Sequence, residues 1–200
     1  MRNSSLHICA LIPTYNNANT ILDVVRRTRK QLKDIIVVVD GCTDNTLDLL
    51  QELEFPVTIV SYPKNKGKGH ALKQGFRKAI ELGFEYALTI DSDGQHYPED
   101  IPLLIDAIKK HPGSMIIGSR KLTSENVPGK NKFANKFSNF WFRLQTHINL
   151  PDTQTGFRIY PLNKLYGLSL LTSRYEAELE LLVFAAWHNV PILPVDIHVY

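Results

Sequence analysis

The chain of 200 residues contains only two cysteines and has no long hydrophobic run. Cys9 and Cys42 alone cannot build a disulfide framework, and their scarcity favours a reducing compartment. No apolar run approaches the roughly 20 residues that a membrane-spanning helix needs. The N-terminal apolar stretch ends at Pro13 without a small-residue cleavage site, which excludes a typical signal peptide. These absences predict a cytoplasmic chain that can meet a membrane only at its surface.

The sequence also lacks a strong excess of either charge, with 23 Lys and Arg against 20 Asp and Glu and a formal net charge of +3. A charge this small, without a concentrated patch, predicts no nucleic-acid partner. The hydrophobic content of 44% and the charged content of 22% are typical of a globular domain that buries a core. We therefore expect one domain over residues 1–200. The final run PVDIHVY reads as an unfinished strand, so we also expect a further C-terminal segment.

Short apolar runs alternate with segments of helical spacing. We expect strands at 7–13, 34–40, 56–62, 86–91 and 114–119, and helices at 18–33, 43–54, 69–82 and 98–110. After Ser119 the pattern predicts a loop at 120–132, a helix at 131–148, a strand at 155–161, helices at 162–171 and 174–188, and a last strand at 191–197. Continuous apolar strands separated by helices predict an α/β fold, with a mostly parallel sheet flanked by helices on both faces.

Polar clusters follow each of the first five expected strands. They read PTYNN, DGCTDNT, PKNKGKGH, DSDGQH and GSRK. Ligands of open parallel sheets bind beyond the carboxyl ends of the strands, where these clusters fall. The sequence therefore predicts one binding site along this edge of the sheet.

The cluster DSDGQH places two carboxylates, Asp91 and Asp93, one residue apart on a turn opened by Gly94. Such a pair can hold Mg²⁺ or Mn²⁺ through oxygen ligands that the metal shares with substrate phosphates. A helix cap before Pro98 is the alternative, but it explains only one of the two carboxylates. An EF-hand is excluded, because the third acidic ligand and the closing Glu are missing at that spacing.

Two other clusters have both a binding and a structural interpretation. The stretch NKGKGHALKQGF lacks the Gly-Lys-Ser/Thr of a P-loop and the third glycine of a dinucleotide fingerprint. It predicts a turn with Lys66 and Lys68 that enters a helix whose N-terminus favours anions, or else a surface loop with solvated lysines. Asp40 can accept hydrogen bonds from a base or ribose, or it can cap the helix that follows.

The helix expected at 131–148 combines aromatic and basic residues. Its spacing places five apolar residues on one face, namely Phe133, Phe137, Phe140, Trp141 and Leu144, with Lys132, Lys136 and Arg143 elsewhere on the helix. This face either packs on the core or lies near lipid headgroups. In the later helix we expect at least one of Glu176, Glu178 and Glu180 to be a solvated surface charge.

Six motifs then occur in one order along the chain: PTYNN, VDGCTD, NKGKGHAL, DSDGQH, GSR and DTQTGFRIYP. In this order and spacing the chain resembles the family 2 glycosyltransferases, in particular the branch of dolichyl-phosphate mannose synthases and polyprenyl-phosphate glycosyltransferases. The resemblance covers essentially the whole sequence. It implies a single domain of the Rossmann-like GT-A fold. It also implies an inverting enzyme that moves a hexose from a UDP- or GDP-sugar to a polyprenyl phosphate, another membrane lipid or a glycan.

The resemblance implies roles for individual residues as well. The nucleotide-sugar contacts would come from Pro13, Tyr15, Asn17, Asp40, Lys68, Asp91, Gln95 and Arg120, and the metal ligands would be Asp91 and Asp93. Asp152 stands where this branch places its candidate general base, and Arg158 would face a phosphate group together with Arg120. For a lipid phosphate, which is already ionised, Asp152 would instead orient other groups or hold Arg158. A plain turn residue after Pro151 is the structural alternative for Asp152.

Three departures from the family pattern fall in the nucleoside pocket. Asn17 replaces a usual Glu, Val39 a usual Asp or Asn, and Cys42 a usual Ser, so the base, uridine or guanosine, stays open. The missing QxxRW motif argues against a processive polysaccharide synthase. A non-catalytic nucleotide-sugar-binding protein is one alternative. A sugar-nucleotide pyrophosphorylase is another, but it would carry a Gly-rich loop where this chain has PTYNN. A lipid acceptor predicts a peripheral position at the inner face of the membrane.

Overall fold

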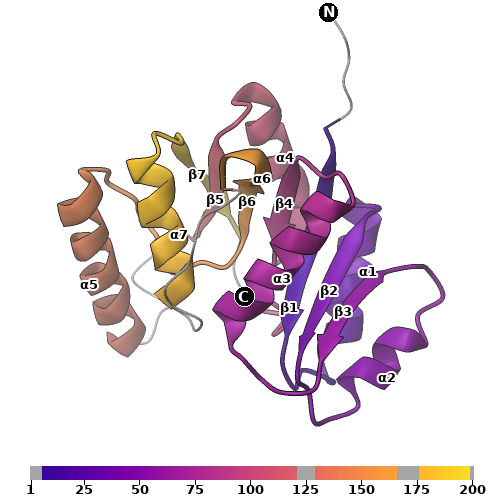
Figure 1. The fold of residues 1–200 in the computed structure, drawn as a ribbon. Coiled ribbons are helices and arrows are strands. Elements are labelled where there is room, and N and C mark those ends of the chain that lie inside the picture. The colour runs from indigo at the N-terminus through magenta and orange to yellow at the C-terminus, as the bar shows by residue number, and fades with distance from the viewer. Residues whose placement is uncertain (1–5, 121–128, 166–175, 199–200) are drawn as a thin grey trace, which may run out of the picture.

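A computed structural model describes residues 6–120, 129–165 and 176–198, with the side chains of 129–137 left out. A seven-stranded sheet forms its centre, in the order β3-β2-β1-β4-β6-β5-β7 (Figure 1). Its strands are β1 (Ile8–Thr14), β2 (Ile35–Asp40), β3 (Thr58–Tyr62), β4 (Tyr86–Thr89), β5 (Met115–Arg120), β6 (Arg158–Pro161) and β7 (Ile192–Ile197). All neighbouring strands pair in parallel except β6, which runs antiparallel to both β4 and β5.

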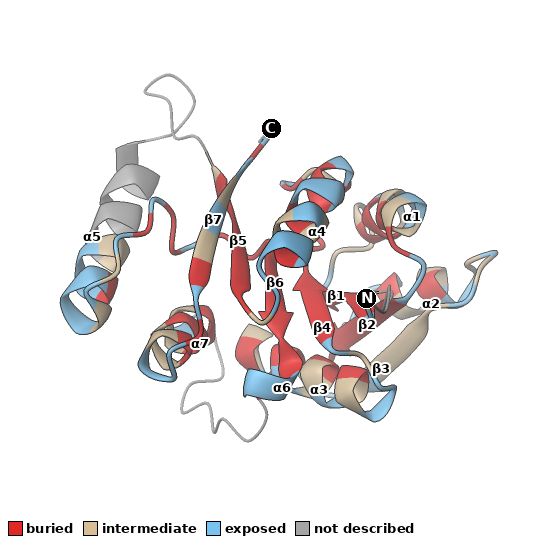
Figure 2. Cartoon of the chain, turned by 90° about the horizontal axis from the view of Figure 1, so that it is seen from above, coloured by how far each residue is buried: buried red, intermediate tan, exposed pale blue. Residues whose placement is uncertain are grey.

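Helices cover both faces of this sheet (Figure 2). One face carries α1 (Ile21–Gln31), α2 (Thr46–Gln51), the short 3₁₀ helix η1 (Pro98–Asp100) and α4 (Ile101–Lys110). The other carries α3 (Lys68–Glu81), α6 (Leu162–Leu165) and α7 (Glu176–Trp187), with α5 (Gly129–Thr146) outside α7. The predicted α/β fold with a mostly parallel sheet flanked on both faces is confirmed.

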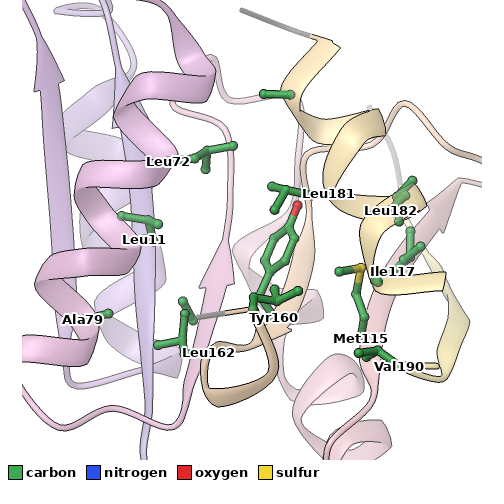
Figure 3. Packing of buried hydrophobic residues seen from close by; sticks show 14 of the residues in the cluster. Leu11, Leu72, Ala79, Met115, Ile117, Tyr160, Leu162, Leu181, Leu182 and Val190 are labelled. Atoms are coloured by element: carbon green, nitrogen blue, oxygen red, sulfur yellow. The ribbon is translucent and has the colours of Figure 1, made fainter. Parts of the chain in front are cut away.

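The apolar runs form the central strands because every residue of β1, β2 and β4 is buried between the two helical layers. In α1 the buried residues Ile21, Val24, Val25 and Thr28 follow the helical spacing of one face. Close approach of α3 to β1 requires glycine, since a Cβ on Gly75 would lie 2.2 Å from Leu11 Cδ1. On the same face Tyr160 stands between α3 and α7, with Leu181 beside it (Figure 3).

Most expected elements occur within a few residues of their predicted ends. The segment expected as one helix at 98–110 divides into η1 and α4, and the helix expected from residue 131 begins at Gly129. The predicted loop residues 121–128 and the helical residues 166–171, 174 and 175 lie outside the described residues. In the part of the chain that is described, no helix has the length and apolar character to cross a membrane.

The outer helix α5 does not bury the face that its spacing suggested. Phe142 is fully buried, whereas Phe140, Trp141 and Leu144 are exposed. The interpretation that this apolar face packs on the core is therefore wrong for these three residues. Among the α5 side chains that the structure describes, the adjacent Phe142 joins the core of this layer. The side chains predicted on the same helix at Lys132, Phe133, Lys136 and Phe137 lie outside the described part.

Candidate active site

A cleft of about 650 Å³ opens at the carboxyl ends of the central strands. Its walls come from the ends of β1 and β2, the loop before α3 and the turn after β4. They are formed by Pro13, Thr14, Tyr15, Asn17, Asp40, Asn65, Lys66, Gly67, Lys68, Ala71, Asp91, Ser92 and Asp93. Four of the five polar clusters contribute to these walls. The cleft therefore lies at the edge of the sheet where the strand ends predicted a binding site.

The end of β2 shapes the lysine-bearing loop. Both carboxylate oxygens of Asp40 accept backbone hydrogen bonds, from Lys66 N at 2.8 Å and from Gly67 N at 2.9 Å. Gly41 has a φ of +65°, and a Cβ there would lie 2.2 Å from the backbone nitrogen of Asn65, so the loop needs glycine to lie this close. Asp40 thus holds the loop that forms one cleft wall. The capping alternative for Asp40 is wrong, because Asp44 accepts the hydrogen bond from Thr46 N at the start of α2.

The loop between β1 and α1 holds the turn that carries Asp91 and Asp93. The Asn17 side chain donates to Ser92 Oγ at 2.9 Å, and the Thr20 hydroxyl donates to the Ser92 carbonyl oxygen at 2.6 Å. Ser92 lies between Asp91 and Asp93. The Asn17 amide therefore helps to hold this turn in position.

Asp91 lies at the centre of the charged groups. Its Oδ1 is 2.5 Å from Lys68 Nζ, and its Oδ2 is 3.6 Å from His96 Nε2. Burial opposes ionisation, but the Lys68 charge, together with the neighbouring His96 side chain, outweighs burial and lowers the pKa of Asp91. Behind the carboxylate lies Gly156, where a Cβ would come within 2.5 Å of Oδ2. Asp91 is thus an ionised carboxylate fixed on three sides.

Lys68 has a second carboxylate partner that the sequence interpretation left among surface charges. Glu178 Oε2, on α7, lies 3.0 Å from Lys68 Nζ, and the Glu178 residue is only 6% exposed. Burial lowers the pKa of Lys68, but Asp91 and Glu178 outweigh it and the net shift is upward. Burial raises the pKa of Glu178, although Lys68 and Arg158 act against that shift. Glu176 remains exposed, as a solvated charge would be.

Arg158 lies in the interior rather than at a phosphate. Its residue exposure is 0%. Its guanidinium donates to the carbonyl oxygens of Glu178 and Thr153, each at 2.8 Å, and to the Tyr160 hydroxyl at 3.3 Å. The expectation that Arg158 faces a phosphate is corrected, because no anion can reach a fully buried guanidinium. Arg158 instead fastens the start of α7 to the segment that follows Asp152.

Asp152 and Arg120 form an ion pair beside the cleft. Arg120 Nε donates to Asp152 Oδ2 at 2.6 Å, and Arg120 Nη2 donates to Oδ1 at 3.2 Å. Oδ1 also accepts a hydrogen bond from Gln154 N at 3.0 Å. The Asp152 side chain has no exposed surface, whereas that of Arg120 is 26% exposed. Asp152 therefore orients Arg120, whose side chain is partly exposed.

Asp93 is the more open member of the aspartate pair. It is exposed, and its Oδ1 accepts a hydrogen bond from Gln95 N at 3.0 Å. Over the described residues, no group of three or more His, Cys, Asp or Glu side chains could hold a metal ion by itself. One or two carboxylates that share a cation with phosphate oxygens are the usual donor set for Mg²⁺. The cleft therefore fits a divalent cation that arrives with a diphosphate.

The structure brings most of the predicted site residues together. Pro13, Tyr15, Asn17, Asp40, Lys68, Asp91 and Asp93 line the cleft. Gln95 lies on the same turn, Arg120 and Asp152 form a pair at the side, and Arg158 is interior. The sequence interpretation missed the contributions of Asn65, Ser92 and Glu178. The one available signal for Glu178 was its place among apolar residues of α7, which is weak because Glu176 and Glu180 share the same helix.

Comparison with known proteins agrees with this geometry. The family described as "Glycosyl transferase family 2" matches residues 9–166. UDP-N-acetylglucosamine–dolichyl-phosphate N-acetylglucosaminyltransferase of Methanococcus voltae is 34% identical, over 95% of this chain and 84% of that protein. Undecaprenyl-phosphate mannosyltransferase of Micrococcus luteus is 30% identical, over 82% of this chain and 70% of that protein.

A solved structure supports the fold independently. Glucosyl-3-phosphoglycerate synthase of Mycobacterium tuberculosis, solved with Mn²⁺, UDP and phosphoglyceric acid, superposes with a TM-score of 0.74. The alignment covers 96% of this chain and 69% of that one at 19% identity, so this likeness concerns the fold. It agrees with the expected GT-A architecture. The matched family and the identity to its relatives together show that the chain is a glycosyltransferase that belongs to glycosyl transferase family 2.

Proposed function

We propose that the protein transfers a hexose from a nucleoside-diphosphate sugar to a polyprenyl phosphate, with inversion at the sugar and with the help of Mg²⁺ or Mn²⁺. Two relatives that are 30% or more identical are named as dolichyl-phosphate and undecaprenyl-phosphate sugar transferases. UDP-sugars are the first donors to test, because UDP occurs in the name of the relative at 34% identity. GDP-sugars are the second.

The donor occupies the cleft in this proposal. Tyr15 and Pro13 offer an apolar wall for the nucleoside, and the loop held by Asp40 supplies another part of the cleft lining. The diphosphate lies near the start of α3, where the helix N-terminus favours anions. Asp93 and Asp91 would hold the cation. Its chemistry would be to neutralise charge on the leaving diphosphate.

The burial of Asp152 and its pairing with Arg120 are the observations that favour a phosphate acceptor. A hydroxyl acceptor needs a base to take its proton. Both oxygens of Asp152 are bound by Arg120, and its side chain has no exposed surface. A phosphate acceptor is already ionised and needs no such base. Arg120 is exposed enough to bind that phosphate, and Asp152 would fix the direction of the guanidinium.

The reaction then needs only alignment of its partners. A phosphate oxygen of the acceptor attacks the anomeric carbon from the side opposite the nucleoside diphosphate, the bond to the leaving phosphate breaks, and the configuration inverts. Positioning of the two reactants in one cleft supplies much of the rate gain. Arg158 and Gly156 would contribute indirectly, since they set the positions of the Asp152 segment and of Asp91.

A lipid acceptor predicts that one face of the protein meets a bilayer, and α5 supplies that face. Phe140, Trp141 and Leu144 are 59%, 42% and 54% exposed, and Trp187 of α7 is 60% exposed. Trp187 Nε1 donates to the Gln145 carbonyl oxygen at 3.4 Å, which joins the end of α7 to α5, and the Phe140 and Trp141 rings pack edge to face with their centroids 5.8 Å apart. The helix α5 itself lies at the outer edge of the fold (Figure 2). We refer to the four exposed residues as the aromatic patch.

Charge and connectivity favour an anionic bilayer as the occupant of the aromatic patch. The sequence of α5, GKNKFANKFSNFWFRLQT, has basic residues and no Asp or Glu. Basic residues near an anionic leaflet contribute about 1 kcal/mol each, and Trp and Tyr are enriched at bilayer interfaces. From the same helix Asn139 donates to the Pro151 carbonyl oxygen and accepts from Thr153 N. The patch is therefore tied directly to the segment that carries Asp152.

Sedimentation with liposomes tests the bilayer assignment. The protein should sediment with phosphatidylglycerol liposomes at low salt and be released as salt rises. The double variant Trp141→Ser, Leu144→Ser should bind at least several-fold less. Leu103→Ser is the matched control, because Leu103 is 43% exposed on α4 at the other face of the sheet. Equal binding by both variants, or a stable dimer that buries the patch, would overturn this assignment.

Turnover tests the reaction itself. Release of nucleoside diphosphate should require a donor, Mn²⁺ and polyprenyl phosphate together, and one donor among a panel of UDP- and GDP-sugars should dominate. Efficient transfer to a soluble sugar, with polyprenyl phosphate ignored, would reject the lipid acceptor. The family assignment would remain.

A further inference from the structure

We propose that Glu178 is a positioning residue of the donor site: it holds the Lys68 ammonium at the back of the cleft and so couples α7 to donor binding. The part of the inference that concerns nucleotide binding rests on the proposed function. Its first readout, the reactivity of Lys68, needs no ligand.

The geometry separates Glu178 from the cleft itself. Lys68 and Asp91 line the cleft, but Glu178 is absent from its walls. Lys68 Nζ lies between the two acids, at 2.5 Å from Asp91 Oδ1 and 3.0 Å from Glu178 Oε2. The Lys68 side chain is 17% exposed and that of Glu178 is 8% exposed. Within the part of the chain that the structure describes, Glu178 reaches a ligand in the cleft through Lys68.

The position of Glu178 is itself fixed from the acceptor side. Its carbonyl oxygen accepts a hydrogen bond from Arg158, whose guanidinium also donates to the Thr153 carbonyl oxygen. Thr153 directly follows Asp152. A continuous set of contacts therefore runs from the Asp152 segment through Arg158 and Glu178 to Lys68.

The charges explain what this arrangement does. Two carboxylates share one ammonium, so two contacts have to break before Lys68 can turn toward a ligand in the cleft. With Asp91 as its sole partner, the ammonium would have only one contact to break before it reaches a bound diphosphate. Glu178 thus keeps Lys68 beside Asp91 and leaves neutralisation of the diphosphate to other groups. One buried oxygen of Glu178, Oε1, has no hydrogen-bond partner, a cost that a purely structural residue would not need.

Acetylation of lysines in the ligand-free protein tests the first part of this inference. With limiting acetic anhydride and peptide mass spectrometry, Lys68 should react far more slowly than the exposed Lys64 of the same loop. Glu178→Gln should raise the Lys68 rate roughly three- to ten-fold, with the Lys64 rate unchanged. Glu176→Gln, an exposed acid on the same helix turn, should leave both rates as they are.

Two results would overturn the inference. An unchanged Lys68 rate in Glu178→Gln would show that Glu178 does not hold the ammonium. A parallel rise at Lys64 and Lys68 would show general loosening of the fold. Thermal unfolding of Glu178→Gln, measured alongside, separates the second case from a specific release.

Nucleotide binding tests the coupling. UDP affinity without metal should rise roughly three- to ten-fold in Glu178→Gln, since the freed ammonium can reach the diphosphate. In a Lys68→Met background the same Glu178 change should have no effect. An equal effect in both backgrounds would reject action through Lys68. If neither UDP nor GDP binds the wild-type protein, the proposed function fails, while the acetylation rates still decide whether Glu178 holds Lys68.

Discussion

Substitution of Gly156 by Ala addresses the arrangement around Asp91 directly. A Cβ at this position would lie 2.5 Å from Asp91 Oδ2 and 2.7 Å from Oδ1. Non-bonded atoms prefer separations of about 3.5 Å, so the carboxylate has to move by about 1 Å. Because Gly156 does not have a positive φ, the alanine backbone itself is unstrained. The perturbation is therefore confined to the position of Asp91.

The size of the effect follows from the Lys68 pair. Lengthening the Asp91–Lys68 contact by about 1 Å from 2.5 Å weakens its attraction by roughly 2 kcal/mol at an effective dielectric constant of about 20. A displacement of about 1 Å at a catalytic group can cost about 100-fold in rate. We expect Gly156→Ala to lose about 1–3 kcal/mol of unfolding free energy and about 100-fold in turnover.

The assay combines urea unfolding with nucleoside diphosphate release at pH 7. Gly113→Ala is the control, because Gly113 has a φ of +75° and precedes β5 at the end opposite the cleft. That variant should lose about 1 kcal/mol or more of stability through backbone strain but keep near-native turnover. If Gly156→Ala also keeps near-native turnover, the position of Asp91 against Gly156 does not affect catalysis, and the reasoning is refuted.

Three further predictions concern single carboxylates. Asp93→Asn should remove most metal dependence and most turnover with unfolding unchanged; unchanged turnover would reject Asp93 as a metal ligand. Asp152→Asn should keep near-native affinity for UDP by calorimetry while turnover falls, and a hundredfold loss of affinity would place Asp152 in the donor site. Because Lys68 and His96 lower the pKa of Asp91 below its unfolded value, the stability that this carboxylate contributes is complete above about pH 4 and is lost as pH falls through its lower folded pKa. Asp91→Asn should therefore flatten the acid side of the stability profile, and a profile identical to the wild type would contradict that pKa shift.

The sheet was predictable because its strands are continuous apolar runs that end in polar clusters. Continuous apolar runs indicate strands that are buried on both faces of the sheet. The carboxyl ends of parallel strands lie at one edge of the sheet, which is where ligands bind. The antiparallel direction of β6 was not predictable, since the four residues of β6 are too short a run to report direction. Strand pairing there depends on contacts far apart in sequence, between β6 and both β4 and β5.

The site was predictable for residues that act at strand ends and not for those that act through partners. Asp91 and Asp93 stand out in sequence because two acids separated by a single residue at the end of an apolar run carry an energetic cost. Glu178 and Arg158 gave no such signal, since their importance comes from partners that the fold brings together. The exposed face of α5 was ambiguous for a related reason: spacing shows that a helix has an apolar face but not which way it points.

Comparison of polyprenyl phosphate with polyprenol, the same chain without the phosphate, tests the central claim most directly. With the preferred nucleotide-sugar and Mn²⁺, polyprenyl phosphate should release nucleoside diphosphate and take up the sugar. Polyprenol should give no product above background, because the buried, Arg120-bound Asp152 cannot take a proton from its hydroxyl. Equal transfer to polyprenol would show that a working general base exists and would contradict the account.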